Sequence, residues 1–365
     1  MLTRFEVQGF KNFDKRIVLD FTDVRDYQFN TRCIKDQLLN KIIVYGKNAV
    51  GKSNLGLALF DIITHLTEKN VGPGLYGHYL NADGETEFAE FYYEFRFGQT
   101  NIAYSYRKSG SDKLLYEKVV VDDDWGFTHD FVTGESIFKG VEERVPQLNL
   151  EFKEANLSLL RYIVNNSKTD DVKPLSMLMS FVSRMLWFRS LDENRYIGYK
   201  TESSDYIKFI FEGDTLEEFE AILHRAGIDE KLIAVEDQSG DRILCFDKKR
   251  PIPFWKVASN GTRALYTVFY WLKTSQDLSL LFIDEFDAYY HTELSETIVD
   301  MLEGYQDFQT ILTSHNTNLL TNRIMRPDCY FILTSGRLVS FSNATKRELR
   351  EGHNLGNLYL RGEFD

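Results

Sequence analysis

The chain has 365 residues, of which 43% are hydrophobic and 27% are charged, a length and composition typical of one large folded domain or two modest ones. Its 43 Lys and Arg residues against 55 Asp and Glu residues give a formal net charge of -12, which disfavours tight non-specific binding to nucleic acid. The charged N-terminus, the lack of a run of about 18 apolar residues and three scattered cysteines predict a cytoplasmic protein without a signal peptide or membrane span.

Alternating apolar residues at the start of the chain predict two short strands, over residues 2–10 and 17–21. The β-branched run at residues 42–45 is typical of a buried strand, and a glycine-rich turn and a helix over residues 52–66 follow it. Between residues 87 and 121 the apolar period returns to two, which predicts an antiparallel meander.

Helical patterns dominate the middle of the chain from about Pro146 to Arg225, including the apolar stretch at residues 175–191. Strand signals return at residues 231–245, and alternating helices and strands then run to Val339. We therefore expect one discontinuous α/β domain with an inserted helical region near its middle.

Residues 46–53 read Gly-Lys-Asn-Ala-Val-Gly-Lys-Ser, which fits the phosphate-binding pattern G-x-x-x-x-G-K-[ST] between a strand and a helix. Its glycines let backbone N–H groups surround phosphates, and the helix N-terminus adds a favourable dipole. In such a loop Lys52 meets the β- and γ-phosphates, and the Ser53 hydroxyl holds Mg²⁺. A chance match is the alternative, and the flanking pattern argues against it.

The apolar run at residues 280–283 ends in Asp284 and Glu285. Such a strand places Asp284 at its carboxyl end beside the phosphate loop, where it can hold Mg²⁺ through water. Glu285 can then polarise the attacking water. Apolar strands that end in two acids are common, so this prediction depends on the pairing with the loop.

Two further segments are candidates for γ-phosphate contacts. Ser259 and Gly261 begin a helix rich in aromatic residues, and Ser259 is equally a plausible N-cap. A second apolar strand, at residues 310–313, leads into His315, which could contact the γ-phosphate or the attacking water. An ordinary surface histidine is the alternative for that residue.

These four motifs, in this order, resemble those of the ABC-type ATPases of the SMC, RecF and OLD group. Residues 46–53 correspond to Walker A, residues 284–285 to Walker B with the catalytic glutamate, and residues 259–261 to the signature motif. Asp287 resembles the D-loop residue, and His315 matches the switch histidine. The signature departs from Leu-Ser-Gly-Gly, and no Q-loop glutamine can be placed.

The two ends of the chain extend the resemblance. Residues 9–13 resemble the first hairpin of that group, which lies near the nucleotide, and residues 351–364 resemble a small subfamily of AAA ATPases in antiphage defence. That subfamily includes the ATPase subunits of abortive-infection and PARIS-type systems. The implied cofactors are ATP and Mg²⁺, with Glu285 and His315 as catalytic residues and Ser53 and Asp284 as metal ligands. The implied nucleotide contacts are Asn12, Gly46, Asn48, Gly51, Lys52, Ser53, Asn54, Ser259 and Gly261.

The resemblance implies an α/β P-loop NTPase fold of the ABC head type, with an antiparallel β meander and an inserted helical lid region. Residues 1–145 would form its first half, residues 146–230 the lid, and residues 231–365 the second half with the signature, Walker B and the switch histidine. ATP would lie between the Walker A loop of one subunit and the signature of another, so we expect an ATP-dependent homodimer or a larger ring.

The resemblance favours a regulatory ATPase that controls a separate toxic effector, such as a Toprim-like nuclease, in bacterial antiphage defence. A RecF- or SMC-like ATPase that clamps DNA is the alternative, and the acidic net charge weighs against it. A transporter subunit would have a shorter segment between Ser53 and Ser259 and a membrane partner. A self-contained OLD nuclease would need a metal domain after His315, where too few residues remain, and the acidic run at residues 122–124 is better explained as a solvated turn. A nucleotide-gated scaffold without turnover is the non-enzymatic alternative.

Overall fold

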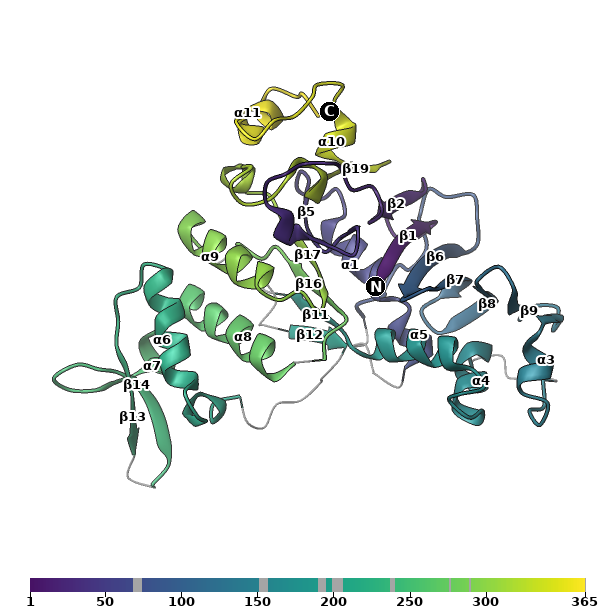
Figure 1. Cartoon of the computed structure of the whole chain (residues 1–365), viewed down its shortest axis with the longest axis horizontal. Coiled ribbons are helices and arrows are strands. Elements are labelled where there is room, and N and C mark those ends of the chain that lie inside the picture. Colours follow the sequence, from purple (N-terminus) through teal and green to yellow (C-terminus); the bar gives the residue numbers. More distant parts are fainter. Residues whose placement is uncertain are drawn as a thin grey trace.

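The computed structural model describes residues 1–67, 74–150, 157–189, 195–198, 206–236, 240–275, 277–288 and 290–364. Two seven-stranded sheets form the centre of the molecule (Figure 1). The first is antiparallel, in the order β10-β9-β8-β7-β6-β1-β2. Its strands are β1 (Leu2–Gln8), β2 (Ile17–Asp20), β6 (Ala89–Phe97), β7 (Thr100–Gly110), β8 (Lys113–Val121), β9 (Trp125–Asp130) and β10 (Ser136–Lys139).

This first sheet confirms the predicted opening strands and meander. In β6 buried and half-buried residues alternate, because one face of the sheet packs on the core and the other meets solvent. β1 pairs with β2 on one side and with β6 on the other, so the start of the chain completes the meander.

The second sheet has the order β12-β11-β16-β17-β5-β18-β19, with parallel pairing from β11 through β18 and antiparallel edges. Every residue of β5, β16, β17 and β18 is buried, as expected for a parallel sheet covered on both faces. Its strands are β5 (Lys41–Tyr45), β11 (Met185–Arg189), β12 (Arg195–Gly198), β16 (Leu280–Asp284), β17 (Gln309–Ser314), β18 (Tyr330–Leu333) and β19 (Leu338–Ser340).

The helix predicted over residues 175–191 is wrong in its second half. A helix covers the first part, but Met185–Arg189 forms β11, which pairs in parallel with the Walker B strand β16. The segment at residues 146–230, predicted as a helical insertion, therefore contributes two strands, β11 and β12, to the second sheet. The rest of that segment does contain helices, and whether they act as a lid stays a prediction.

The helices cover the parallel sheet on both faces: α1 lies on one face, and α8 and α9 lie on the other (Figure 1). The helices are α1 (Lys52–Phe60), α2 (Ile63–Leu66), α3 (Val141–Arg144), α4 (Leu159–Asn166), α5 (Lys173–Ser183), α6 (Thr215–Arg225), α7 (Phe254–Val257), α8 (Asn260–Thr274), α9 (Thr292–Glu303), α10 (Phe341–Ala344) and α11 (Leu355–Leu360). Among the described residues no helix combines the length and apolarity needed to cross a membrane.

Short elements complete the chain. A small sheet of β13 (Leu232–Glu236), β14 (Arg242–Phe246) and β15 (Ile252–Pro253) lies beside α6 and α7, away from the two large sheets (Figure 1). β3 (Ile34–Lys35) and β4 (Leu38–Leu39) pair with each other. Single 3-10 turns lie at Thr31–Cys33, Phe209–Phe211, Thr317–Leu319 and Pro327–Cys329.

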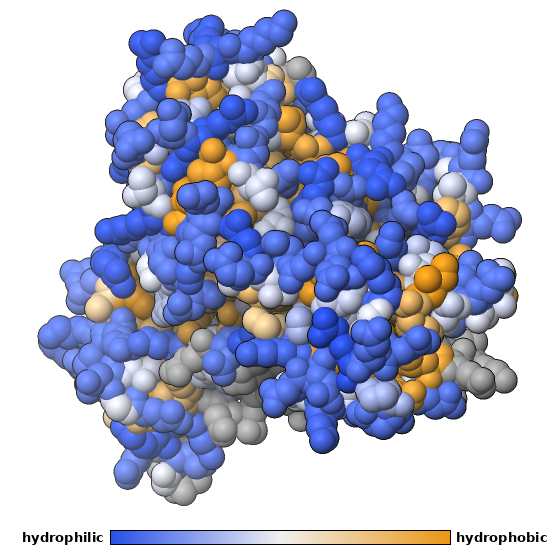
Figure 2. All heavy atoms as spheres, turned by 45° about the vertical axis from the view of Figure 1, so that its right-hand side comes forward, coloured by the Kyte–Doolittle hydropathy of each residue, from blue (hydrophilic) through white to orange (hydrophobic). Residues whose placement is uncertain are grey.

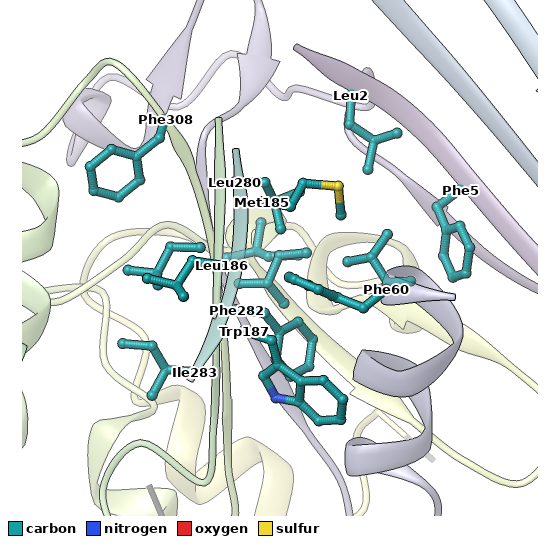
Figure 3. Packing of buried hydrophobic residues seen from close by; sticks show 14 of the residues in the cluster. Leu2, Phe5, Phe60, Met185, Leu186, Trp187, Leu280, Phe282, Ile283 and Phe308 are labelled. Atoms are coloured by element: carbon teal, nitrogen blue, oxygen red, sulfur yellow. The ribbon is translucent and has the colours of Figure 1, made fainter. Parts of the chain in front are cut away.

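The core lies where α1 is packed between the two large sheets. Phe60 of α1 points towards Trp187 and Phe282 of the parallel sheet, with ring centroids 5.8 and 6.3 Å away (Figure 3). Gly56 permits this close approach, since a Cβ there would lie 2.9 Å from the Phe282 ring. On the other side, the Tyr93 hydroxyl of β6 donates to carbonyls of α1. The helix that begins at the phosphate loop is thus held by both sheets.

The surface seen in Figure 2 is largely hydrophilic, with apolar patches between the polar side chains. Exposed apolar side chains include Val132 and Ile137, which flank the turn into the edge strand β10, and Val257 just before the candidate signature.

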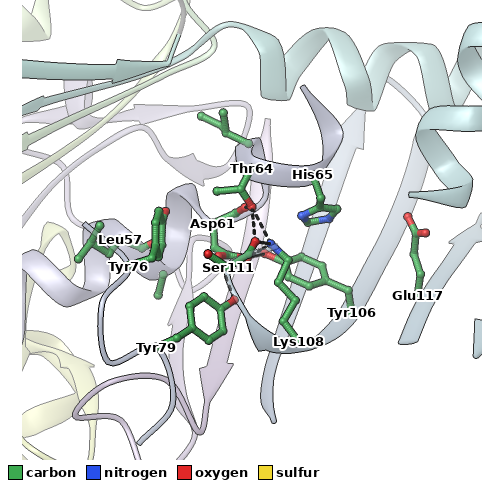
Figure 4. A network of polar contacts seen from close by, with 12 residues as sticks. Leu57, Asp61, Thr64, His65, Tyr76, Tyr79, Tyr106, Lys108, Ser111 and Glu117 are labelled. Atoms are coloured by element: carbon green, nitrogen blue, oxygen red, sulfur yellow. Dashed lines mark hydrogen bonds and ion pairs between the residues drawn. The ribbon is translucent and has the colours of Figure 1, made fainter. Parts of the chain in front are cut away.

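A buried ion pair joins the end of α1 to the antiparallel sheet. The Lys108 ammonium of β7 lies 2.8 Å from an Asp61 carboxylate oxygen, and both side chains are fully buried (Figure 4). The hydroxyls of Tyr79 and Tyr106 also donate to Asp61, each over 2.9 Å, and Lys108 donates to the Thr64 hydroxyl. Burial lowers the pKa of Lys108, and the Asp61 carboxylate opposes that shift. Lys108 and Asp61 compensate each other's charge away from solvent, so removing one of them leaves the other buried without a counter-charge.

Replacing Lys108 with methionine should therefore lower the free energy of unfolding by about 3 kcal/mol, because Asp61 then stays buried without its cation. Urea denaturation followed by circular dichroism measures this change. Arg350→Met is the control, since Arg350 pairs with Glu348 at the exposed surface and its loss should leave the midpoint unchanged. Equal midpoints for the Lys108 variant and the unmodified protein would show that the pair does not stabilise the fold.

Candidate functional site

Three parallel strands bring the predicted motifs to one edge of the second sheet. Tyr45 at the end of β5 lies opposite Ser314 of β17, and Ile283 near the end of β16 lies opposite Leu312. The phosphate loop, the two acidic residues and His315 follow these strand ends directly. β17 lies between β5 and β16, so its last residues border both the loop and the acidic turn.

The loop at residues 46–53 closes around the Lys52 ammonium. Lys52 is the first residue of α1, and its Nζ donates to the carbonyl oxygens of Gly46, over 2.9 Å, and of Lys47, over 3.3 Å. Asn48 and Ala49 form the exposed crown of the loop, and Ala49 has a φ of 64°. The N-cap residue of α1, Gly51, has no side chain to cap the first-turn N–H groups. These groups are therefore available to an anion.

Acidic side chains set the electrostatics around this lysine. Burial lowers the pKa of Lys52, and the carboxylates of Glu285, Asp284 and Asp287 oppose the shift. Lys52 is only 5% exposed. Lys52, the N-terminus of α1 and the three carboxylates thus lie at one edge of the sheet, as the sequence predicted for Lys52, Asp284 and Glu285.

Asn12 and Asn54 support the loop from the side. The Asn12 amide donates to the Val50 carbonyl oxygen over 2.8 Å, and the Asn54 amide donates to the Asn12 side-chain oxygen over 2.6 Å. Asn12 belongs to the first hairpin, so that hairpin contacts the phosphate loop, and its closeness to a nucleotide stays a prediction. Ser53, the second residue of α1, is half-buried beside them.

Gly51 is the position where the loop is most tightly constrained. Its φ is 105°, and a Cβ there would lie 2.4 Å from the Asn12 side chain. Gly51→Ala should weaken ATP binding by at least about tenfold, or ~1.4 kcal/mol, because the loop must shift to relieve the clash. Titration with a fluorescent ATP analogue measures the affinity. Gly134→Ala is the matched control, because Gly134 has a φ of 75° but open space around its Cβ position. Equal affinity in both variants would contradict the assigned loop geometry.

Asp284 and Glu285 are fixed by the neighbouring strand. Asp284 is the last residue of β16 and is 7% exposed, and the Thr313 hydroxyl donates to its Oδ1 over 2.6 Å. The same hydroxyl accepts a hydrogen bond from the Glu285 N–H over 2.7 Å. Glu285 has a φ of 44°, in the left-handed region, and is half-buried.

Asp287 lies in the same turn, and its surroundings were not foreseen from the sequence. The Ser314 hydroxyl donates to its Oδ2 over 2.8 Å, while its buried Oδ1 has no hydrogen-bond partner among the described residues. Burial raises the pKa of Asp287, and His315 is one of the groups that oppose the shift. His315 itself is exposed, directly after β17. The run Thr313, Ser314 and His315 marks this strand end in the sequence, but the prediction from the sequence included only His315.

The candidate signature lies elsewhere in the chain. Ser259 is the N-cap of α8, as one interpretation predicted: its hydroxyl accepts from the Thr262 N–H over 3.1 Å and lies 2.8 Å from the Thr262 hydroxyl. These bonds are local to α8, which packs against Phe219 of α6 through Tyr266. Ser259 is exposed and Gly261 is half-buried. The structure therefore does not join them by hydrogen bonds to the phosphate loop of the same chain.

The residues present fit Mg²⁺ and a nucleoside triphosphate. Gly46 has no room for a side chain, since a Cβ there would lie 2.7 Å from Val50 and 2.8 Å from the Leu333 carbonyl oxygen. Among the described residues no group of three or more His, Cys, Asp or Glu side chains could hold a metal ion alone. Mg²⁺ suits a site of one or two protein oxygens completed by phosphate and water oxygens, and Ser53 and Asp284 offer those two.

A phosphate loop between a parallel strand and its helix, with two acids at the end of a nearby strand, defines a P-loop NTPase fold. The chain belongs to the family described as "AAA domain, putative AbiEii toxin, Type IV TA system", whose model matches residues 41–321. That range includes the loop, the acidic pair and His315.

Solved structures similar to the chain include heads of SMC proteins. The head bound to the C-winged-helix domain of ScpA is 12% identical, with a TM-score of 0.46 and coverage of 93% of this chain and 97% of that chain. The head from Thermotoga maritima is 11% identical, with a TM-score of 0.45 and coverage of 93% and 98%. The head with an extended coiled coil bound to the C-terminal domain of ScpA, from Pyrococcus furiosus, is 12% identical, with a TM-score of 0.45 and coverage of 93% and 95%. No curated protein matches the chain.

Proposed function

We propose that the chain binds Mg·ATP and hydrolyses it to ADP and phosphate. The observation that carries this proposal is the buried Lys52 ammonium, held inside the loop at residues 46–53 and facing the carboxylates of Asp284 and Glu285. Loop N–H groups and Lys52 would bind the phosphates, with Asn12 and Asn54 keeping the loop in shape. Ser53 and Asp284 would hold Mg²⁺, which neutralises charge on the transferred phosphoryl group when bound.

Hydrolysis needs a group that orients water towards the γ-phosphate. Glu285 directly follows the proposed metal ligand, and its backbone is held by the Thr313 hydroxyl, so its carboxylate would serve as that group. His315 would contact the γ-phosphate from the end of β17. Both residues stand at the same edge of the sheet as the loop.

We further propose that two copies complete each site. Ser259 and Gly261 stand at the start of α8, where the Ser259 hydroxyl bonds within the helix, and they would meet the γ-phosphate of a second chain. The resemblance to ABC-type ATPases supports this arrangement. ATP would then act as the bridge between subunits, and hydrolysis would release them.

The biological role that we propose is control of a separate toxic effector, such as a nuclease, in antiphage defence. The family description, which names a putative AbiEii toxin and a type IV toxin–antitoxin system, supports a place in such a system. Within the described residues no cluster of metal-binding side chains offers a nuclease centre in this chain, and a separate effector would supply it.

Native mass spectrometry of the protein purified from its host tests both proposals, with Mg·ATP or Mg·ADP present and with co-purifying chains identified. An ATP-dependent oligomer that carries a second protein supports effector control. An ATP-dependent dimer that carries DNA instead would favour the alternative of a DNA-clamping ATPase. A protein that stays monomeric both in Mg·ATP and in Mg·ADP would contradict the proposal that two copies complete each site.

A further inference from the structure

The hydroxyl of Thr313 connects the two acidic residues of the site. It donates to Asp284 Oδ1 over 2.6 Å and accepts from the Glu285 N–H over 2.7 Å, so its donor and one acceptor position are both used. The Thr313 side chain is fully buried at the end of β17. One small side chain therefore fixes the proposed metal ligand and the backbone of the proposed catalytic residue at once.

The backbone at Glu285 needs such support. Its φ of 44° lies in the left-handed region, which is unfavourable for a residue with a side chain. Residues in such conformations persist when their surroundings hold them in place. Here the Glu285 N–H bonds to the Thr313 hydroxyl, and the next N–H, of Phe286, bonds to the Thr313 carbonyl oxygen over 3.1 Å. The direction in which the Glu285 carboxylate leaves the turn thus depends on Thr313.

Thr313 also belongs to the strand that borders the phosphate loop. Its neighbour in β5, Val44, is two residues before Gly46, and the pairing of β17 with β5 continues to Ser314. The Thr313 hydroxyl therefore connects the turn at Asp284 and Glu285 to β17, and β17 is hydrogen-bonded to β5, the strand that leads into the phosphate loop.

We propose that Thr313 is a positioning residue for ATP hydrolysis: its hydroxyl sets the orientation of Asp284 and Glu285 relative to the bound γ-phosphate. This inference rests on the proposed ATPase function. The Thr313 hydroxyl contacts the Asp284 carboxylate and the Glu285 backbone, so its effect on catalysis would pass through these two residues. It should govern the rate of the chemical step more than the binding of ATP.

Thr313→Val keeps the branched shape and removes the hydroxyl. We expect kcat to fall by about 10- to 100-fold, because misplacing a reacting group by a small distance has effects of that size. ATP affinity should stay within about threefold, since the loop and Lys52 remain. Thr313→Ser restores the hydroxyl and should recover most of kcat. A kcat that is as low in Thr313→Ser as in Thr313→Val would overturn the proposal.

Thr310→Val is the matched control on the same strand. Thr310 is also buried, but its hydroxyl has no hydrogen-bond partner among the described residues, so its removal should leave kcat unchanged. If Thr313→Val is too unstable to purify, Thr313→Cys, with only a weak S–H donor, should show the same loss of kcat. A kcat equal to that of the unmodified protein in either Thr313 variant would contradict the inference.

A double-variant cycle with Glu285→Gln separates the inference from the proposed function. Thr313→Val should slow Glu285→Gln less than it slows the unmodified protein, because only the effect that passes through Asp284 remains. If the unmodified protein hydrolyses no ATP, the proposed function fails, and if Glu285→Gln is as fast as an active unmodified protein, only the catalytic role of Glu285 fails. If Glu285→Gln is slow and Thr313→Val is not, the function stands and the inference about Thr313 is wrong.

Discussion

Lys52→Ala is expected to lower the affinity for Mg·ATP by roughly 100-fold, or about 3 kcal/mol, the usual cost of removing one partner of a buried charge pair. The ammonium already lies within the loop, bonded to the carbonyl oxygens of Gly46 and Lys47. A bound triphosphate would replace those oxygens as its partner. Without the lysine, the phosphates would face the carboxylates of Asp284 and Glu285 with one compensating charge fewer.

Isothermal titration calorimetry of Mg·ATP into both proteins measures this loss. Lys113→Ala serves as the control, because that lysine is exposed at the start of β8, in the other sheet, and has the same charge. The control should bind ATP as the unmodified protein does. Retained affinity in Lys52→Ala would refute the assignment of residues 46–53 as a nucleotide-binding loop.

Glu285→Gln is expected to slow ATP hydrolysis by about 100- to 1,000-fold, in the range measured for removal of a general base. The amide keeps the size of the side chain but loses the negative charge that would polarise the attacking water. Binding of ATP should persist, since the loop, Lys52 and Asp284 are unaltered. Single-turnover quenched-flow measurements separate the chemical step from nucleotide binding and release.

Glu293→Gln provides the control for this change, because Glu293 is an exposed acid in the first turn of α9. Its rate should equal that of the unmodified protein. An unchanged single-turnover rate in Glu285→Gln would remove Glu285 from the catalytic role.

Period-two patterns were reliable guides to the antiparallel sheet. In β6 and β7 buried residues alternate with half-buried ones, and that alternation is visible in the sequence because only one face packs on the core. Strands β5 and β16 were equally accessible to prediction, since short β-branched or apolar runs lay next to a recognisable loop and to an acidic pair.

Strand β11 was not predictable in the same way. Met185–Arg189 follows α5 after a single residue, Arg184, and both segments are apolar with no glycine or proline between them. Periodicity cannot distinguish a buried strand from a buried helix over five residues. The choice is made by tertiary structure, because β11 pairs with the edge of β16 and Trp187 packs against Phe60 of α1.

The site could be predicted wherever one motif carries its own chemistry. The loop at residues 46–53 and the pair Asp284 and Glu285 belong to this kind, and the structure brings them together at one sheet edge. The contacts of Thr313 and Ser314 with residues 284–287 could not be predicted, because they depend on β17 lying between β5 and β16. The spacing of residues along the chain does not determine the order of the strands within the sheet.

Steady-state phosphate release from saturating Mg·ATP is the most direct test of the proposed ATPase. The unmodified protein and Lys52→Ala would be purified in parallel and assayed with Mg²⁺ and with a chelator. We predict release that needs Mg²⁺ and disappears in Lys52→Ala, because the loop, its lysine and Asp284 act together. Release at the same rate in both proteins, or no release by the unmodified protein at any concentration, would contradict the account.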